Sequence, residues 1–367
     1  MKSIAKGFLA VLLAAFIMAG CSSQGMSGTG IDAGEPDVSR QQEESQSEVT
    51  VGFSGDPETW DPCGGFGYSP LFSTLVKVNG ENKLENDLAT EYAMSDDGLT
   101  WTFKIRDGVT FSNGEKLDAE DVAFTFSTTK EKATYVDLTM MESCRALDAS
   151  TVEFKMTKPC VTFIYTVAGT GIVPKDSYNE NFGMEPIGSG PYKLTQWDKG
   201  QQVILEAYYG NAPEIKKAVF LVQEEDARFV AAKAGEVDIA LTSATLAVTD
   251  IEGMRVVSVD SVDNRGITFP VLPDEGKTTE DGYKIGNNVT SDIAIRKAMS
   301  YGIDRERIIN EALNGLANPA YSECDGLPWW NAENVIETDV DYALQLLEEA
   351  GWKDEDGDGV REKDGIR

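Results

Sequence analysis

Histidine is absent from all 367 residues of the chain. Imidazole is the usual general base near neutral pH and the commonest protein ligand for zinc. Its absence excludes Ser-His-Asp catalysis, Cys-His catalysis and histidine-ligated metal sites. We also expect no cofactor and no protein-bound metal.

Cysteine is scarce, with five residues, and no two of them form a Cys-x-x-Cys pair. The absence of this spacing excludes a zinc ribbon and a thioredoxin-type redox site. Beyond the first cysteine, Cys21, the chain has Cys63, Cys144, Cys160 and Cys324. These four allow alternative disulfide pairings, and free buried thiols are an equally good interpretation.

Positive charge is also in short supply. The chain has 32 Lys and Arg against 62 Asp and Glu, which gives a formal net charge of -30. A surface of this kind repels the phosphate backbone and lacks the basic footprint of a nucleic-acid-binding protein. We expect no nucleic acid among its partners.

Long apolar runs are missing except near the amino terminus. There, Lys2 and Lys6 precede an apolar run from Phe8 to Ala19. This run is short for a membrane span but suits the core of a signal peptide. The small residues before Cys21 resemble a lipoprotein signal-peptidase site, which predicts a palmitoyl-type lipid on the Cys21 sulfur.

The segment after Cys21 is polar up to Ser47. It is rich in Ser, Gly, Glu and Gln, and it cannot bury enough apolar surface to fold. We expect a lipoprotein signal peptide at 1–20, a flexible tether at 21–47 and a chain anchored by lipid to the extracytoplasmic face of the cell membrane.

Residues 97–126 contain three local structural signals in succession. Leu99, Trp101, Phe103 and Ile105 alternate with polar residues, which predicts a strand with one buried face. Asp107-Gly108 predicts a tight turn, and 109–111 should return as the second strand of a hairpin. Asp118 then precedes a helical pattern of apolar residues that its carboxylate can cap.

The sequence of this segment resembles a block found in bacterial extracytoplasmic solute-binding proteins of family 5; it reads DGLTWTFKIRDGVTFSNGEKLDAEDVAF. Four further segments support the resemblance: Asp61-Pro62, GSGPY at 188–192, GEVDI at 235–239, and the helical segment 292–306. The family comprises the oligopeptide-, dipeptide- and nickel-binding components of ABC importers. Here Gly188 and Gly190 should allow a tight turn of the chain.

The resemblance implies an α/β fold of the two-lobe, type II periplasmic-binding-protein-like kind. Lobe I is expected at 48–83 and 186–264, with an extra subdomain inserted at 84–185, and residues 264–270 should form a hinge strand. Lobe II is expected at 265–367. Family members continue beyond this point, so the resemblance implies an incomplete lobe II and pocket residues that lie past Arg367.

Four residues are candidates for ligand contact. Phe66 and Tyr68 lie in a glycine-rich segment after Asp61-Pro62 that approaches the cleft in the family; core packing is the alternative for both rings. Thr242 follows the strand through Ile239, and ligands in open α/β sheets gather at the carboxyl ends of strands. Phe269 is a candidate through its place in the hinge strand.

The expected function is that of a monomeric lipoprotein that captures a peptide between two lobes and delivers it to ABC permease subunits in the membrane. Nickel or a metal chelate is the alternative solute, and a structural surface lipoprotein is a further possibility. Ser127-x-x-Lys130 fits one motif of penicillin-binding enzymes, but the companion motifs are missing, so no enzyme activity is expected. A calcium loop at 354–365 lacks the required Glu at its twelfth position, Gly365.

Overall fold

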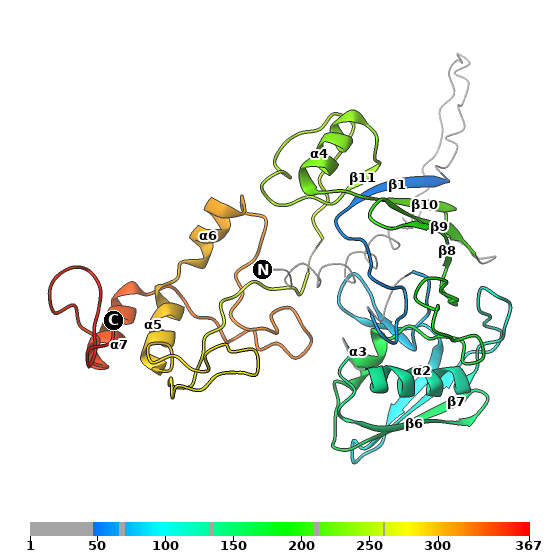
Figure 1. The fold of residues 1–367 in the computed structure, drawn as a ribbon, viewed down its shortest axis with the longest axis horizontal. Coiled ribbons are helices and arrows are strands. Elements are labelled where there is room, and N and C mark those ends of the chain that lie inside the picture. Colours follow the sequence, from blue (N-terminus) through cyan, green and yellow to red (C-terminus); the bar gives the residue numbers. More distant parts are fainter. Residues whose placement is uncertain (1–46, 66–69, 133–135, 209–212, 260) are drawn as a thin grey trace, which may run out of the picture. The chain divides into compact units, whose positions relative to one another are not determined.

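The computed structural model describes residues 47–367, except 66–69, 133–135, 209–212 and 260. The chain forms two compact units (Figure 1). The first extends to Ser243 and includes Asp250–Arg255, and the second comprises Ala244–Thr249 and Val256–Arg367. The lobe boundaries expected from the sequence stay predictions.

The first unit contains a mixed five-stranded sheet. In spatial order its strands are β11 (Ile239–Ala240), β1 (Glu48–Phe53), β10 (Lys217–Val222), β9 (Gln202–Ala207) and β8 (Tyr192–Asp198). β1 is parallel to both neighbours, whereas β10, β9 and β8 are antiparallel in succession. Helix α4 (Glu225–Ala234) connects β10 to β11, so β10, α4 and β11 form a crossover that passes β1.

A second sheet of the first unit carries the predicted strand of residues 99–105. Its order is β4 (Ala89–Met94), β5 (Thr100–Ile105), β7 (Thr151–Met156) and β6 (Met141–Asp148). The short strands β2 (Val76–Val78) and β3 (Leu84–Asn86) pair separately. The alternation in β5 is confirmed, because Trp101, Phe103 and Ile105 are buried in the largest apolar cluster of the described residues.

The predicted hairpin is wrong. β5 pairs with β4 and β7, and Thr110 makes only an isolated bridge to Lys116. Phe111 is fully buried and contributes to the core rather than to a ladder. The turn at Gly108 is present, with a φ of 79°, but the chain after it leaves the sheet because both edges of β5 are already occupied by longer strands.

The predicted capped helix is confirmed as α2 (Ala119–Lys132). The Glu120 amide donates to the Asp118 carboxylate at 2.8 Å, and the Asp118 amide donates to Asp121 at 2.9 Å. Both bonds satisfy amides near the start of the helix. α2 packs on β6 and β7, where the rings of Phe126 and Phe154 meet edge to face at 4.8 Å. Helix α3 (Phe163–Ala168) completes this core.

Gly188 and Gly190 lie against the backbone of residues 70–72. A Cβ on Gly188 would be 1.8 Å from the Leu71 carbonyl oxygen, and one on Gly190 would be 2.4 Å from that of Pro70. Neither glycine has a positive φ, so a left-handed backbone conformation is not the reason for glycine at these positions. They are required by the close approach of two backbone segments, which are joined by a 2.9 Å hydrogen bond from the Gly190 amide to the Leu71 carbonyl.

The second unit contains three helices among its described residues. They are α5 (Ile293–Gly302), α6 (Arg305–Ala312) and α7 (Val340–Glu349), each with an aspartate as its N-cap. The helical segment predicted at 292–306 is therefore confirmed, as α5 and the start of α6. The hinge strand predicted at 264–270 is wrong, since the described residues 261–272 form no strand. An isolated extended segment gains no ladder hydrogen bonds, and none of the described residues offers it a partner strand.

Asp292 joins three parts of the second unit. One carboxylate oxygen caps α5 by accepting from the Ala294 amide at 2.9 Å. The other accepts from the buried Trp352 indole at 3.0 Å and from the Lys363 ammonium at 2.9 Å. The Lys363 hydrogen bond, aided by those from Ala294 and Trp352, lowers the pKa of Asp292 from 3.8 to about 2.

We expect the Asp292 carboxylate to stabilise the second unit at neutral pH and to lose that effect in acid. Its pKa is lower in the folded state, so its contribution is complete above about pH 4 and disappears as the pH falls through about 2. The shift corresponds to ~2 kcal/mol for a side chain that is 22% exposed. Urea unfolding of wild type and D292N between pH 7 and pH 3 should show a difference that narrows below about pH 4.

The matched control for this prediction is D304N. Asp304 also caps a helix, accepting from the Arg307 amide at 2.9 Å, and asparagine caps about as well as aspartate. D304N should stay within about 0.5 kcal/mol of wild type across the range. A D292N penalty that is constant from pH 7 to pH 3 would contradict the role of the charge.

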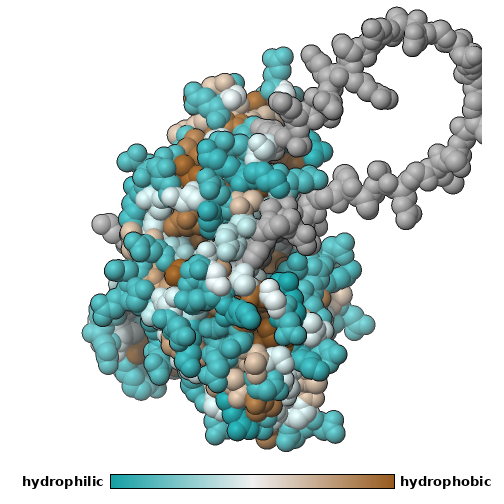
Figure 2. Space-filling model, turned by 90° about the vertical axis from the view of Figure 1, so that its right-hand side faces the viewer, coloured by the Kyte–Doolittle hydropathy of each residue, from teal (hydrophilic) through white to brown (hydrophobic). Residues whose placement is uncertain are grey.

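All four cysteines of the described region are unpaired. Burial raises the pKa of Cys63 to about 11 and raises that of Cys144 well above its usual range, so both thiols are poor nucleophiles. The free-thiol alternative therefore holds over the disulfide alternative, although only Cys63 is buried and the other three are partly exposed. No helix within the described residues is long and apolar enough to cross a bilayer. Hydrophilic residues predominate on the face drawn in Figure 2, in keeping with the acidic composition.

Candidate ligand-binding edge

The carboxyl ends of β1, β10 and β11 meet at one edge of the five-stranded sheet. The three strands are parallel, and their register pairs Phe53 with Val222 and Gly52 with Ala240. The chain therefore leaves β10 at Gln223 and leaves β11 at Leu241 on the same side. In open α/β sheets this edge is the usual place for a ligand.

Two polar atoms at this edge are buried and have no hydrogen-bond partner among the described residues. They are Gln223 Oε1, directly after β10, and Thr242 Oγ1, two residues after β11. Leaving such an atom unpaired costs ~1–3 kcal/mol, which a polar partner reaching the edge would recover. This pair is the strongest indication of a binding function in the described part of the first unit.

Arg228 holds the backbone on which these two side chains lie. It projects from the first turn of α4 and is only 5% exposed. Its Nε donates to the Leu241 carbonyl at 2.9 Å, and its Nη1 donates to the Gln223 carbonyl at 2.5 Å. Burial lowers the pKa of Arg228, while the nearby Glu225 and Glu224 raise it in part. The guanidinium thus bridges Gln223 and Leu241, the first residues after β10 and β11, which we call the exits of these two strands.

A second polar cluster fixes the turn at Asp61-Pro62. Asp61 is buried, and its carboxylate accepts from the Lys132 ammonium at 2.7 Å and from the Tyr178 hydroxyl at 2.6 Å. The other carboxylate oxygen accepts from the Cys63 amide at 2.9 Å. Burial, together with the hydrogen bond to Asp61, raises the pKa of Tyr178, so the phenol stays neutral and donates. The cluster fixes the turn as far as Gly65, whose amide donates to the Asp61 carbonyl at 2.9 Å.

The four predicted contact residues have different outcomes. Phe66 and Tyr68 lie outside the described residues, as does the predicted lipidation site Cys21. Thr242 lies at the edge of the parallel strands with its hydroxyl buried, and Phe269 is half-buried in the second unit. A role in ligand contact stays a prediction for all four.

Gln223, Arg228 and Gly52 were missed by the sequence analysis. A glycine inside the strand pattern VTVGF was the available signal, because such a glycine marks a bulge or a close approach of other groups. A Cβ at Gly52 would lie 3.2 Å from Gln223 Oε1 and 3.3 Å from Arg228 Cγ. Arg228 lies in the first turn of a helix that begins with acidic residues, and such a sequence is typical of an exposed helix start. The pattern of apolar residues around Arg228 does not predict that it is buried.

The serine and lysine of the Ser-x-x-Lys motif are engaged separately. The Ser127 hydroxyl donates back to the Ala123 carbonyl of α2 at 2.8 Å. The Lys130 ammonium donates to the carbonyl oxygens of Met141 and Glu142 at the start of β6. The ammonium therefore does not activate the hydroxyl as a base would in an acyl-transfer enzyme.

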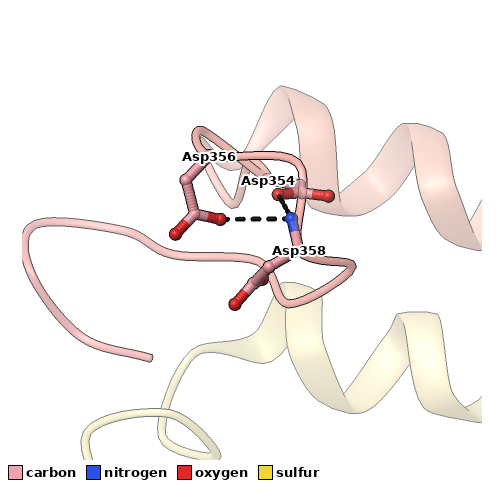
Figure 3. Close-up of side chains that lie close together, drawn as sticks. All are labelled: Asp354, Asp356 and Asp358. Carbon is pink, nitrogen blue, oxygen red and sulfur yellow. Dashed lines mark hydrogen bonds between the residues drawn. The ribbon is translucent and has the colours of Figure 1, made fainter.

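The acidic loop of the second unit brings three carboxylates together. Oxygens of Asp354, Asp356 and Asp358 lie within 4.8 Å of one another, and all three side chains are exposed (Figure 3). The Asp358 amide donates to Asp354 at 3.1 Å and to Asp356 at 3.2 Å. Two further amides, those of Gly357 and Gly359, also donate to Asp354. The loop is stabilised as a turn by these bonds, and exposed acidic groups in such a turn do not by themselves indicate an ion.

Comparison with known proteins gives consistent matches. The sequence profile of the bacterial extracellular solute-binding proteins, family 5 (middle region), matches residues 83–366. Protein XP55 of Streptomyces lividans is 32% identical over 347 residues, covering 88% of this chain and 60% of that protein. The oligopeptide-binding protein AppA of Bacillus subtilis is 28% identical over 321 residues, covering 80% and 56%.

Solved structures agree with these relatives. NikZ from Campylobacter jejuni in complex with Ni(L-His) superposes with a TM-score of 0.71 at 25% identity, covering 88% of this chain and 66% of that one. AppA in complex with a nonapeptide gives a TM-score of 0.62 at 26% identity, covering 87% and 67%. The predicted α/β fold of the type II periplasmic binding proteins is confirmed. The chain spans 60% or less of the length of the two curated relatives named above.

Proposed function

Because the chain belongs to the bacterial extracellular solute-binding proteins of family 5, we propose that it is the solute receptor of an ABC importer. In this proposal it captures a peptide between two lobes and delivers it to the permease subunits in the membrane. The lobes correspond to the predicted ranges 48–264, with the inserted subdomain, and 265–367. The protein acts as a monomer held at the extracytoplasmic surface by lipid on Cys21.

The unpaired polar atoms at the carboxyl edge of β10 and β11 are the observation that carries the peptide proposal. Gln223 Oε1 accepts hydrogen bonds, and Thr242 Oγ1 can accept or donate. A peptide supplies backbone N–H and C=O groups at regular intervals, which matches this need. The likeness to AppA, whose solved structure holds a nonapeptide, supports the same class of solute.

Capture would occur by closure of one lobe toward the other. A solute favours the closed state only by the difference between its interactions in the closed and open states. Polar groups that have no hydrogen-bond partner in the absence of solute, and that pair with the solute in the closed state, would supply such a difference. The proposal involves binding without chemical change, because Ser127 and Lys130 are committed to backbone carbonyls.

A nickel or metal chelate is the second candidate solute. The likeness to NikZ, solved with Ni(L-His), favours it. The chain has no histidine of its own, so its side chains cannot provide imidazole ligands. A metal would therefore have to arrive as a preformed chelate whose organic ligand makes most of the contacts.

We expect a pool of tri- to pentapeptides to stabilise the protein measurably. At a peptide concentration about 100-fold above the Kd, binding to the folded state adds ~2.7 kcal/mol to its stability. Thermal unfolding with and without the pool measures this shift, and native mass spectrometry identifies the bound peptides. Nickel with L-histidine, tested in parallel, should leave the midpoint unchanged; a shift in that arm alone supports the chelate alternative, and no shift in either arm contradicts both.

The isosteric variant T242V sharpens this test. Removing a buried hydroxyl that lacks a partner should raise the stability of the unliganded protein by ~1 kcal/mol and weaken peptide binding about 10-fold. T90V is the matched control, because the Thr90 hydroxyl lies in the other sheet and already donates to the Lys104 carbonyl. T90V should leave peptide affinity unchanged.

A further inference from the structure

The side chain of Arg228 packs against strand β1 at Gly52, in the place that a side chain on Gly52 would fill. Gly52 lies in β1 one residue before its end, and it is buried. A Cβ there would meet Arg228 Cγ at 3.3 Å and Arg228 Cδ at 3.4 Å. The aliphatic part of the arginine therefore runs over the strand at the position where the strand has no side chain.

The guanidinium joins two strands that do not pair with each other. β10 and β11 lie on opposite sides of β1. Arg228 donates to the carbonyl of Gln223, directly after β10, and to that of Leu241, directly after β11. On the backbone, the Gln223 amide donates to Phe53 at 2.9 Å and the Leu241 amide to Gly52 at 3.3 Å. The arginine adds a direct connection between these two exits.

The chemistry of the bridge requires arginine. Its planar guanidinium presents donors in a fixed fork, so two carbonyls can be held at one separation. A lysine ammonium at this position keeps the charge but has no rigid fork. Hydrogen bonds from a charged donor are stronger than those from a neutral donor, so two of them can order two short segments. Arg228 is only 5% exposed, so it does not serve as a solvated surface charge.

We propose that Arg228 and Gly52 form a positioning unit that fixes the distance between the exits of β10 and β11, and so presents Gln223 Oε1 and Thr242 Oγ1 to the solute in one arrangement. Arg228 acts through two backbone carbonyls and makes no contact with the solute itself. The effect of this unit on solute binding rests on the proposed function. Its effect on the order of the chain at Gln223 and Leu241 exists in the unliganded protein and can be measured there.

The decisive experiment is hydrogen exchange of the unliganded protein. In R228M, amide exchange at Gln223 and Leu241 should accelerate about 10-fold or more, because the bond that ties the two exits is lost. R228K should give nearly the same acceleration, since it retains charge without the fork. The amides of β5 and β7, in the other sheet, are the internal reference and should keep their wild-type rates.

Two matched controls come from the same chain. Arg305 also donates to two carbonyls, those of Ser300 and Ala320, each at 3.1 Å, but it belongs to the second unit. R305M should leave exchange at Gln223 and Leu241 unchanged. G52A should accelerate exchange there as R228M does, since the new methyl displaces the arginine stem, whereas G80A, with nothing within 4 Å of its Cβ, should have no effect.

Three results would overturn the proposal. Wild-type exchange at Gln223 and Leu241 in R228M is one, and equal acceleration in β5 and β7 is another, because it indicates general destabilisation. Wild-type behaviour of R228K is the third, because charge alone would then suffice. Peptide-pool titration of the same variants is a separate arm: absence of binding by the wild type counts against the proposed function, while the exchange result still decides the positioning unit.

Discussion

Replacing Gly190 by alanine is expected to destabilise the first unit by about 3 kcal/mol or more. The new Cβ would lie 2.4 Å from the Pro70 carbonyl oxygen, 2.6 Å from the Leu71 carbonyl carbon and 2.7 Å from the Phe72 amide nitrogen. All three atoms belong to the backbone, so no side-chain rotation relieves the overlap. Urea unfolding followed by tryptophan fluorescence measures the loss as a lower midpoint with an unchanged slope.

The backbone contact at Gly190 also carries hydrogen bonds. The amides of Gly190 and Tyr192 donate to the carbonyls of Leu71 and Pro70, and the Ser73 hydroxyl donates to the Ser189 carbonyl at 3.0 Å. Moving the two segments apart to admit a methyl group would break these bonds as well. The expected cost is therefore larger than that of an overpacked side chain alone.

G80A is the control for this substitution. Gly80 has open space around its Cβ position and no positive φ, so alanine there should change stability by less than about 0.5 kcal/mol. If G190A unfolded at the same urea concentration as G80A, the close approach of residues 70–72 to Gly190 would be contradicted.

Replacing Cys21 by alanine is expected to abolish lipid attachment completely. The predicted modification is on the cysteine sulfur, and alanine offers no nucleophile in its place. Each buried methylene of an acyl chain contributes ~0.8 kcal/mol to membrane binding, and stable anchoring takes more than one chain or signal. Metabolic labelling with an alkyne fatty acid, followed by intact-mass measurement, should show a labelled wild type that lacks residues 1–20 and an unlabelled C21A that retains them.

C324A is the matched control for the lipidation experiment. Cys324 is also an unpaired cysteine, and it lies far from the amino terminus in sequence. This variant should be labelled and processed as the wild type is. Labelling of C21A, or a wild type that carries no lipid, would contradict the predicted anchor and leave a plain signal peptide as the interpretation of residues 1–20.

Local elements were predicted well where a short sequence contains both the element and its end signal. The alternation of Trp101, Phe103 and Ile105 specifies which side of β5 is buried, since side chains of a strand alternate between its two faces. Asp118 caps the helix that follows it, because a carboxylate just before a helix meets its first amides. These interactions span only a few residues, so one sequence suffices.

Pairing between distant segments was not predictable in the same way. The return strand expected at 109–111 is absent because β4 and β7 occupy both edges of β5, and β7 begins 46 residues after β5 ends. The hinge strand expected at 264–270 has no partner among the described residues. A ladder depends on a second strand and its register, which the extended sequence pattern of one segment does not specify.

The sequence by itself determined the family, through the motif block at 97–126 and the segments that agree with it, and it determined the local helices and strand faces. Those features depend on residue types at short spacing. Only the tertiary structure decided why Gly190 must be glycine, which strands flank β5 and how Arg228 crosses Gly52 to join the exits of β10 and β11. These features arise where segments far apart in the chain approach within a few ångströms, and a single sequence carries no measure of that distance.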